Sequence, residues 1–160
     1  LFKELFGFAS ESFIAPCYIW RSSLEKSLYE NGIKYIQGLS LQQIPVKENP
    51  LKVKVKYHYF GQRNFFNQIY LIRNSFFEPY KNNETDKWVN ECLYRINVAF
   101  RWKKPAIISS HRLNFIGSID SSFRDKNLFL FKHLLQEIVK KWPDVEFLST
   151  NQLGRILDEH

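Results

Sequence analysis

The sequence predicts an α/β fold, and two patterns support this prediction. In the second half, segments with helical spacing alternate with short apolar segments, in the order helix, strand, helix, strand, helix. Near the start, residues 12–15 and 33–37 are typical of short strands and enclose a predicted helix at 22–31, which is the order of a βαβ unit. Chains with this alternation form mainly parallel sheets covered by helices.

Turn and capping residues set the ends of the first elements. Gly7 is expected to end a short helix over residues 1–6. Ser22 or Ser23 can cap the helix of the βαβ unit. Gly32 suits the position just after that helix, because glycine readily adopts a positive φ.

The middle of the chain is predicted to form a β-hairpin. Its strands are residues 51–59 and 67–73, and the turn residues at 61–64 join them. A loop over residues 38–50 precedes the hairpin, and a second loop over residues 74–83 follows it.

Two long amphipathic helices dominate the second half. The helix predicted over residues 85–102 has one apolar stripe, formed by Trp88, Val89, Cys92, Leu93, Ile96, Ala99 and Phe100. The next helix, which Asp125 can cap, has an apolar face formed by Leu128, Phe131, Leu135, Ile138 and Trp142. A strand over residues 145–148 and a last helix capped by Thr150 or Asn151 complete the predicted order.

The composition sets the class of the protein. We expect residues 1–160 to form a single α/β domain, because this length suffices for one core. The chain begins at Leu1 and has no methionine, so we expect it to be part of a larger protein. Its apolar runs are too short for a membrane span. Its two cysteines are interpreted as free thiols, which favours a reducing compartment such as the cytoplasm, although the location stays unknown.

The net charge of +7 raises the question of an anionic partner. Lys52, Lys54 and Lys56 alternate with apolar or aromatic residues, which is typical of a strand with one solvated face. We therefore interpret the charge as solvation and expect no nucleic-acid partner. A polyanion binder is the last of the alternatives, because no RNP, zinc-finger or helix-turn-helix signature is present.

Residues 105–114 are the most informative segment. A buried apolar strand is predicted up to Ser109, and the polar run Ser110, His111 and Arg112 follows it directly. Ligands bind at the carboxyl ends of strands in α/β sheets and barrels. His111 is therefore a candidate proton-transfer group, and the alternative is a surface histidine in a connecting loop.

Several segments, in this order, carry a resemblance to a known family. Residues 76–79, continuing through the predicted long helix to 104–115, and residues 142–149 resemble the C-terminal half of a NodB-like polysaccharide deacetylase. Residues 12–20 and 32–38 resemble the third motif of that family and the strand after it.

The resemblance implies a fold and a reaction. The fold would be part of an irregular (β/α) barrel, the C-terminal part of a larger catalytic domain, with the predicted hairpin as an insertion. The reaction would be metal-dependent removal of acetyl groups from a polysaccharide or amino sugar. His111 matches the family histidine that protonates the leaving group.

Two family features have no match in this chain. The resemblance implies a divalent, zinc-like metal in the full-length enzyme, held by an aspartate and an H-x₃-H pair. No such set occurs here, so we expect these ligands before Leu1. The family arginine of the third motif is also missing; it is absent altogether, or Arg21, Arg73 or Arg112 replaces it.

Five further residues are candidates for substrate binding. Tyr18 and Trp20 follow a strand and could stack on a sugar ring, although Trp20 could equally belong to the core. Arg112 and Asn114 could bind sugar hydroxyls or be plain surface groups. Glu78 either anchors its loop through a charge-assisted hydrogen bond, which we favour, or replaces a missing carboxylate.

A second class of function stays open. The missing arginine and metal ligands would also fit a catalytically inactive carbohydrate-binding or scaffold domain of the same fold. An exposed sheet edge would in addition permit a homo-oligomer.

Overall fold

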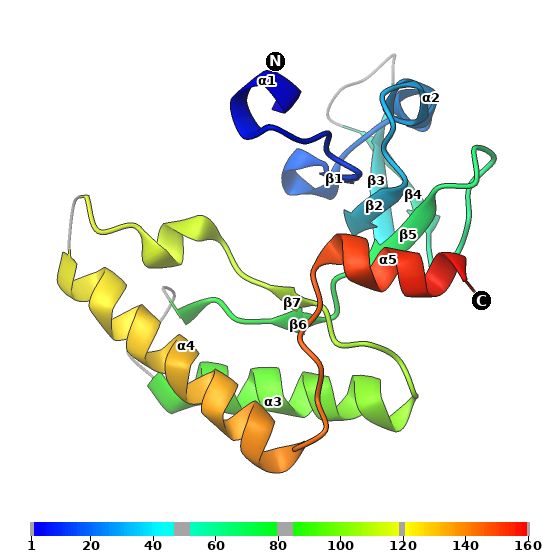
Figure 1. Cartoon of the computed structure of the whole chain (residues 1–160). Coiled ribbons are helices and arrows are strands. Elements are labelled where there is room, and N and C mark those ends of the chain that lie inside the picture. The colour runs from blue at the N-terminus through cyan, green and yellow to red at the C-terminus, as the bar shows by residue number, and fades with distance from the viewer. Residues whose placement is uncertain (1, 47–51, 80–84, 119–120, 160) are drawn as a thin grey trace. The chain divides into compact units, whose positions relative to one another are not determined.

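The computed structural model describes residues 2–46, 52–79, 85–118 and 121–159. The fold is mixed α/β, as predicted (Figure 1). The chain divides into two compact units, the first formed by residues 1–72 and 147–160 and the second by residues 73–146. Within the described ranges, no helix is both long enough and apolar enough to cross a membrane.

A three-stranded parallel sheet forms the centre of the first unit. Its order is β1 (Ser12–Ile14), β2 (Tyr35–Gly38) and β5 (Ile69–Ile72). Helix α2 (Ser23–Glu30) connects β1 to β2, so the predicted βαβ unit is confirmed. Gly32 follows α2 with a φ of 81°, the positive value for which glycine is favoured.

Other first elements agree with the sequence in outline. Helix α1 (Phe2–Phe6) ends before Gly7, whose φ is 76°. Ser22 stands at the N-cap of α2, but its hydroxyl makes no capping hydrogen bond.

The predicted hairpin is wrong. Strand β4 (Val53–Tyr57) pairs antiparallel with β3 (Leu41–Pro45), which lies in the segment predicted to be a loop, and β5 pairs with β2 instead. Ile69, Tyr70 and Leu71 of β5 are buried although β5 is the last strand of its sheet, whereas every residue of β4 is exposed. An isolated bridge pairs Ile69 with Arg63, which lies in the predicted turn and not in the first predicted strand.

Helix α5 (Thr150–Asp158) begins one residue earlier than the predicted caps imply. Ser149 is the N-cap, and it forms a capping box with Gln152 through two reciprocal hydrogen bonds. The strand predicted over residues 145–148 is also wrong, because no ladder forms there and Phe147 and Leu148 are exposed.

Tyr35 and Gln37 of β2 hold α5 on the sheet. The Tyr35 hydroxyl donates to Asp158 Oδ2 at 3.0 Å, and Gln37 Nε2 donates to Thr150 Oγ1 at 2.9 Å. Burial, followed by the hydrogen bond to Asp158, raises the pKa of Tyr35 to about 12. Gly154 lies directly on the ring of Tyr35, where a Cβ atom would overlap the ring carbons.

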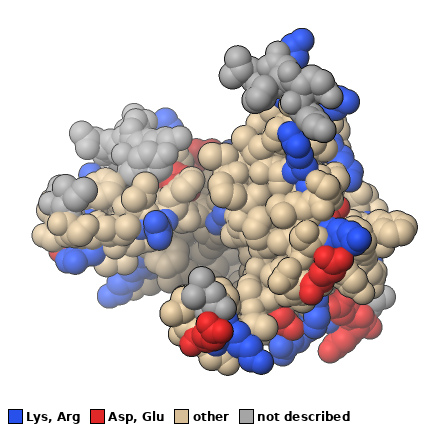
Figure 2. Space-filling view, turned by 90° about the horizontal axis from the view of Figure 1, so that it is seen from above, with Lys and Arg blue, Asp and Glu red and all other residues tan. Residues whose placement is uncertain are grey.

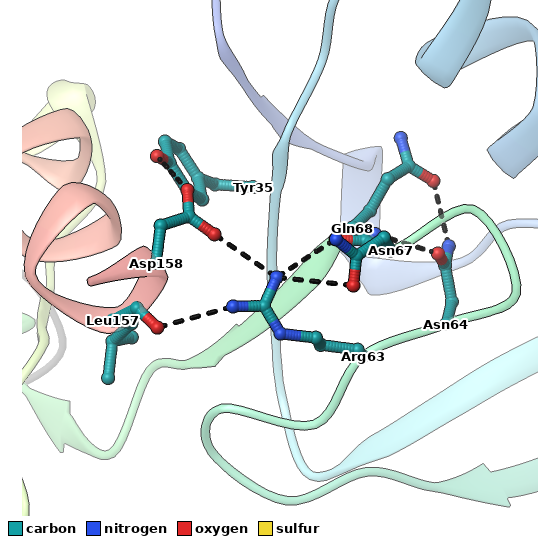
Figure 3. Close-up of polar contacts among 7 residues, drawn as sticks. All are labelled: Tyr35, Arg63, Asn64, Asn67, Gln68, Leu157 and Asp158. Atoms are coloured by element: carbon teal, nitrogen blue, oxygen red, sulfur yellow. Dashed lines mark hydrogen bonds and ion pairs between the residues drawn. The ribbon is translucent and has the colours of Figure 1, made fainter. Parts of the chain in front are cut away.

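Arg63 fixes the end of the same helix (Figure 3). Its guanidinium donates to Asp158 Oδ1 at 3.1 Å and to the carbonyl of Leu157 at 3.2 Å. The same group donates to both oxygens of Asn67 at 3.3 Å. Since Asp158 receives bonds from both Tyr35 and Arg63, the C-terminal turn of α5 is fixed to two separate segments of the first unit.

The second unit consists of two helices and two short strands. Helices α3 (Thr85–Arg101) and α4 (Ser121–Lys141) lie side by side, and β6 (Ser75–Phe76) pairs in parallel with β7 (Ile108–Ser109) (Figure 1). A short helix, η3 (Arg112–Phe115), follows β7. The buried core consists of Phe77, Val89, Cys92, Ile96, Leu130, Leu134 and Ile138.

The buried face of α4 differs from the predicted one. Asp125 lies inside the helix, which begins at Ser121, so it is not the cap. Leu130 and Leu134 are buried, whereas Leu128 is exposed. Phe131, Leu135 and Trp142, which also belong to the predicted face, pack beside the core. The buried face of α4 is therefore centred on Leu130 and Leu134, next to the face that the sequence predicts. Apolar residues lie on both sides of the true stripe, so periodicity alone does not fix its centre.

We expect Gly154→Ala to destabilise the protein. The added methyl group would overlap the Tyr35 ring, and forced overpacking of this kind costs about 1–3 kcal/mol of unfolding free energy. Urea unfolding followed by circular dichroism measures this change. Arg155→Ala, on the exposed side of the same helix, is the control and should change the value by less than about 0.5 kcal/mol. Equal effects of the two substitutions would contradict the packing described.

Candidate functional site

The register of β6 and β7 creates the candidate site. Ser75 pairs with Ile108, and Phe76 pairs with Ser109. The same offset of 33 residues places Glu78 opposite His111, just beyond the carboxyl ends of the two strands. The backbone N–H of Phe77 donates to the carbonyl of Ser109 at 2.9 Å, which carries the ladder up to the site.

His111 and Glu78 form a hydrogen-bonded pair. The distance between His111 Nδ1 and Glu78 Oε1 is 2.8 Å, and the His111 backbone N–H approaches Glu78 Oε2 at 3.4 Å. The Glu78 side chain is 10% exposed, whereas that of His111 is 67% exposed. Because an ionised carboxylate only accepts hydrogen bonds, Nδ1 must carry a hydrogen, and Nε2 is the nitrogen left for other partners.

Asn114 orients the Glu78 carboxylate from inside the unit. Its Nδ2 donates to Glu78 Oε2 at 2.8 Å and to Ser110 Oγ at 3.1 Å. Its side chain is completely buried, and the Asn114 carbonyl accepts from Asn127 Nδ2 of α4 at 2.9 Å. The sequence suggested sugar binding or a plain surface position for Asn114. The residue is interior instead, and it holds the carboxylate that holds the histidine.

Glu78 has the anchoring role that the sequence favoured, with partners that the sequence did not identify. Its carboxylate binds His111 and Asn114, so it ties the segment after β6 to the segment after β7. Arg112 lies beside this group in η3 and is exposed, which leaves its guanidinium open to a ligand.

Tyr18 and Trp20 belong to the first unit. Trp20 is buried, its Nε1 donates to Glu25 Oε1 at 3.2 Å, and its ring stacks on His58. In this structure its faces are therefore not open to a sugar ring. Tyr18 is half-buried and has a φ of 58°, directly after Cys17 with a φ of 50°. Two consecutive left-handed residues store strain just after the end of β1. A stacking role for Tyr18 stays a prediction.

A buried polar cluster around Glu25 was not anticipated from the sequence. Besides Trp20, the Tyr70 hydroxyl donates to Glu25 at 2.8 Å and Asn64 Nδ2 donates at 3.1 Å. Burial, then the bond to Glu25, raises the pKa of Tyr70. Burial lowers the pKa of neighbouring His58, whose ring stacks on Tyr70. Glu25 looks like any polar residue of an amphipathic helix, so no sequence signal marked it.

The two cysteines have different environments. Cys17 is exposed, and Cys92 is buried in the core of the second unit. Burial raises the pKa of Cys92 to about 12, which makes it a poor nucleophile. Across the described ranges, no three or more His, Cys, Asp and Glu side chains form a group that could hold a metal ion.

Positive charge is distributed over the surface. Lys54 and Lys56 are exposed on β4, but Val53, Val55 and Tyr57 are exposed too, so the predicted strand with only one solvated face is wrong. On the face drawn in Figure 2, Lys and Arg side chains are spread out, with Asp and Glu among them, rather than collected in one patch.

Replacing Asn114 by alanine is expected to lower the unfolding free energy by about 2–4 kcal/mol, because the buried Glu78 carboxylate loses a donor. Chemical denaturation measures the loss. Exposed Arg112, two residues away, provides the matched control: Arg112→Ala should shift the value by less than about 0.5 kcal/mol. A neutral Asn114→Ala would show that the amide does not support the carboxylate.

Thiol labelling should distinguish the two cysteines. At pH 8 the raised pKa leaves almost no Cys92 thiolate, so only Cys17 should react with dithiobis(nitrobenzoate) in the folded protein. Both thiols should react after unfolding in guanidinium. Fast labelling that survives Cys17→Ser would contradict the burial of Cys92.

Comparison with known proteins adds no family assignment. No protein-family model matches this chain, and no curated protein matches it. The resemblance to NodB-like deacetylases therefore stays a prediction that depends on the residues named above.

Proposed function

We propose that this chain is part of a carbohydrate deacetylase of the NodB-like type, with His111 as the general acid. In this proposal the parallel strands belong to an irregular (β/α) barrel, and the β3–β4 ribbon is an insertion. The substrate class is an acetylated polysaccharide or amino sugar. The single observation that carries the proposal is the hydrogen bond between His111 and Glu78 at the carboxyl ends of two parallel strands.

The chemical step requires a proton at the leaving atom. Hydrolysis adds water to the acetyl carbonyl carbon and breaks the bond from this carbon to the sugar nitrogen or oxygen. Acetate is released, and the sugar atom takes up a proton as it departs; of the two protons that the water loses, one restores the proton donor and the other goes to solvent. The imidazolium of His111 is suited to supply this proton from Nε2, because Nδ1 is bound to Glu78.

The supporting residues have separate roles in this proposal. Glu78 selects the ring form that carries the Nδ1 hydrogen, and Asn114 holds the carboxylate in place from the buried side. Both therefore act as positioning residues. Arg112, exposed beside His111, would bind sugar hydroxyls or a carboxylate with its planar set of donors.

The divalent metal implied by the resemblance does not fit the residues described for this chain. No group of three potential ligands occurs in residues 2–46, 52–79, 85–118 or 121–159. The proposal therefore assigns no step to a metal, and it rests on proton transfer by His111 alone.

The test measures acetate release by the protein expressed from its natural coding sequence. The substrates are a hexamer of N-acetylglucosamine and an acetylated xylan hexamer. His111→Ala should lower kcat by about 10²–10⁴-fold, the usual contribution of a positioned acid. Glu78→Gln keeps the shape but removes the charge, so its effect should be smaller and in the same direction.

His133→Ala is the matched control, because His133 lies on α4 of the same unit and takes no part in the His111–Glu78 group. It should leave kcat unchanged. Full activity of a folded His111→Ala protein would disprove the proposed role. Glycan binding without any acetate release from the wild-type protein would favour the inactive carbohydrate-binding alternative.

A further inference from the structure

A groove of about 740 Å³ lies between α3 and the segments that precede β6 and β7 in the second unit. Its lining includes Asn74, Glu91, Tyr94, Arg95, Val98 and Trp102. Asn74 directly precedes β6, and the groove also reaches Lys104, which precedes β7. The groove is therefore at the amino ends of the two strands, whereas Glu78 and His111 follow their carboxyl ends. It is a separate site.

Two exposed aromatic rings stand at the groove. Tyr94 is 67% exposed and Trp102 is 76% exposed. The Trp102 backbone N–H still donates to the carbonyl of Val98, so the two residues keep helical spacing and lie about 12 Å apart along the axis. This separation is longer than one sugar ring. The aromatic rings of Tyr94 and Trp102 can therefore contact different units of one glycan chain.

An ion pair of α3, between Glu91 and Arg95, also lines the groove. Arg95 Nη2 donates to Glu91 Oε1 at 2.9 Å, and the guanidinium lies 5.1 Å from the centre of the Phe76 ring. Among the described residues, Arg95 Nη1 and Glu91 Oε2 have no partner. The groove thus offers a donor and an acceptor side by side on a preorganised support.

We propose that this groove binds an uncharged stretch of a glycan chain, at a site distinct from the one that contains His111. The rings of Tyr94 and Trp102 stack on the apolar faces of sugar rings, and Arg95 and Glu91 bind sugar hydroxyls. The inference deepens the proposed deacetylase function, on which it rests for its substrate class. It gives the protein a second contact with the polymer, outside the reacting unit.

The lining favours a glycan over other partners. Glu91 balances the charge of Arg95, so Lys104 is the one excess positive group in the described part of the lining, which is too little charge to favour a polyanion. An apolar helix would bury the free donor and acceptor without partners, which is costly. Sugar hydroxyls satisfy both groups while the C–H faces cover the rings.

Calorimetric titration of the whole protein with the N-acetylglucosamine hexamer and the acetylated xylan hexamer tests the inference. Trp102→Ala and Tyr94→Ala should each weaken binding of the preferred hexamer about ten-fold, as expected for an aromatic anchor. Phe129→Ala is the matched control, since Phe129 is 70% exposed on α4 and outside the groove, and its affinity should equal that of the wild type.

Acetate release from monomeric N-acetylglucosamine separates the two proposals. Trp102→Ala should release acetate at the wild-type rate, because a monomer does not need the groove. Wild-type affinity in Trp102→Ala, an equal loss in Phe129→Ala, or no binding of either hexamer by the wild type would overturn the inference. Groove-dependent binding without acetate release would instead overturn the deacetylase proposal and keep the groove.

Discussion

The parallel pairing of β6 with β7 is the constraint on which the candidate site depends. Two residue pairs define this ladder, and partners in both pairs are 33 residues apart in the sequence. The same separation holds beyond the strands, where Glu78 lies opposite His111. The carboxylate is nearly buried, so it needs donors, and His111 and Asn114 supply them. Asn114 is fixed in turn by α4. The exposed imidazole is thus the outer end of a chain of contacts that begins in the core of the second unit.

The burial gradient along this chain explains how a surface group can be held firmly. Asn114 is completely enclosed, Glu78 is nearly so, and His111 presents one nitrogen outward. Preorganisation of this kind lets a side chain meet a ligand without first losing rotational freedom. The Glu25 cluster in the first unit has the same type of buried carboxylate with several donors, but two of these donors, Trp20 and Tyr70, are buried too. That cluster stabilises the interior instead of presenting a group to solvent.

Periodicity predicted α3, which has one clear apolar stripe, and Gly32 with its positive φ indicated the end of α2, but the buried face of α4 was predicted wrongly. It failed where pairing is non-local. Val–Lys alternation identified β4 as a strand but not its partner, since β3 carries a proline at its end and resembles a loop. At the site, the sequence correctly predicted that His111 follows a strand. The role of Asn114 was not, because residue type alone does not distinguish a buried amide from an exposed one.

The first unit is discontinuous in sequence, and this affects the order in which the protein can fold during translation. Its central strand leaves Tyr35 and Gln37 without their covering helix until residues 150–158 have been made. Domains generally fold as units while the ribosome synthesises the chain from its N-terminus. The second unit, residues 73–146, is contiguous in sequence and can therefore fold before the first unit is complete. The nascent N-terminal sheet must therefore wait for α5, and until then the side chains of Tyr35 and Gln37 stay uncovered.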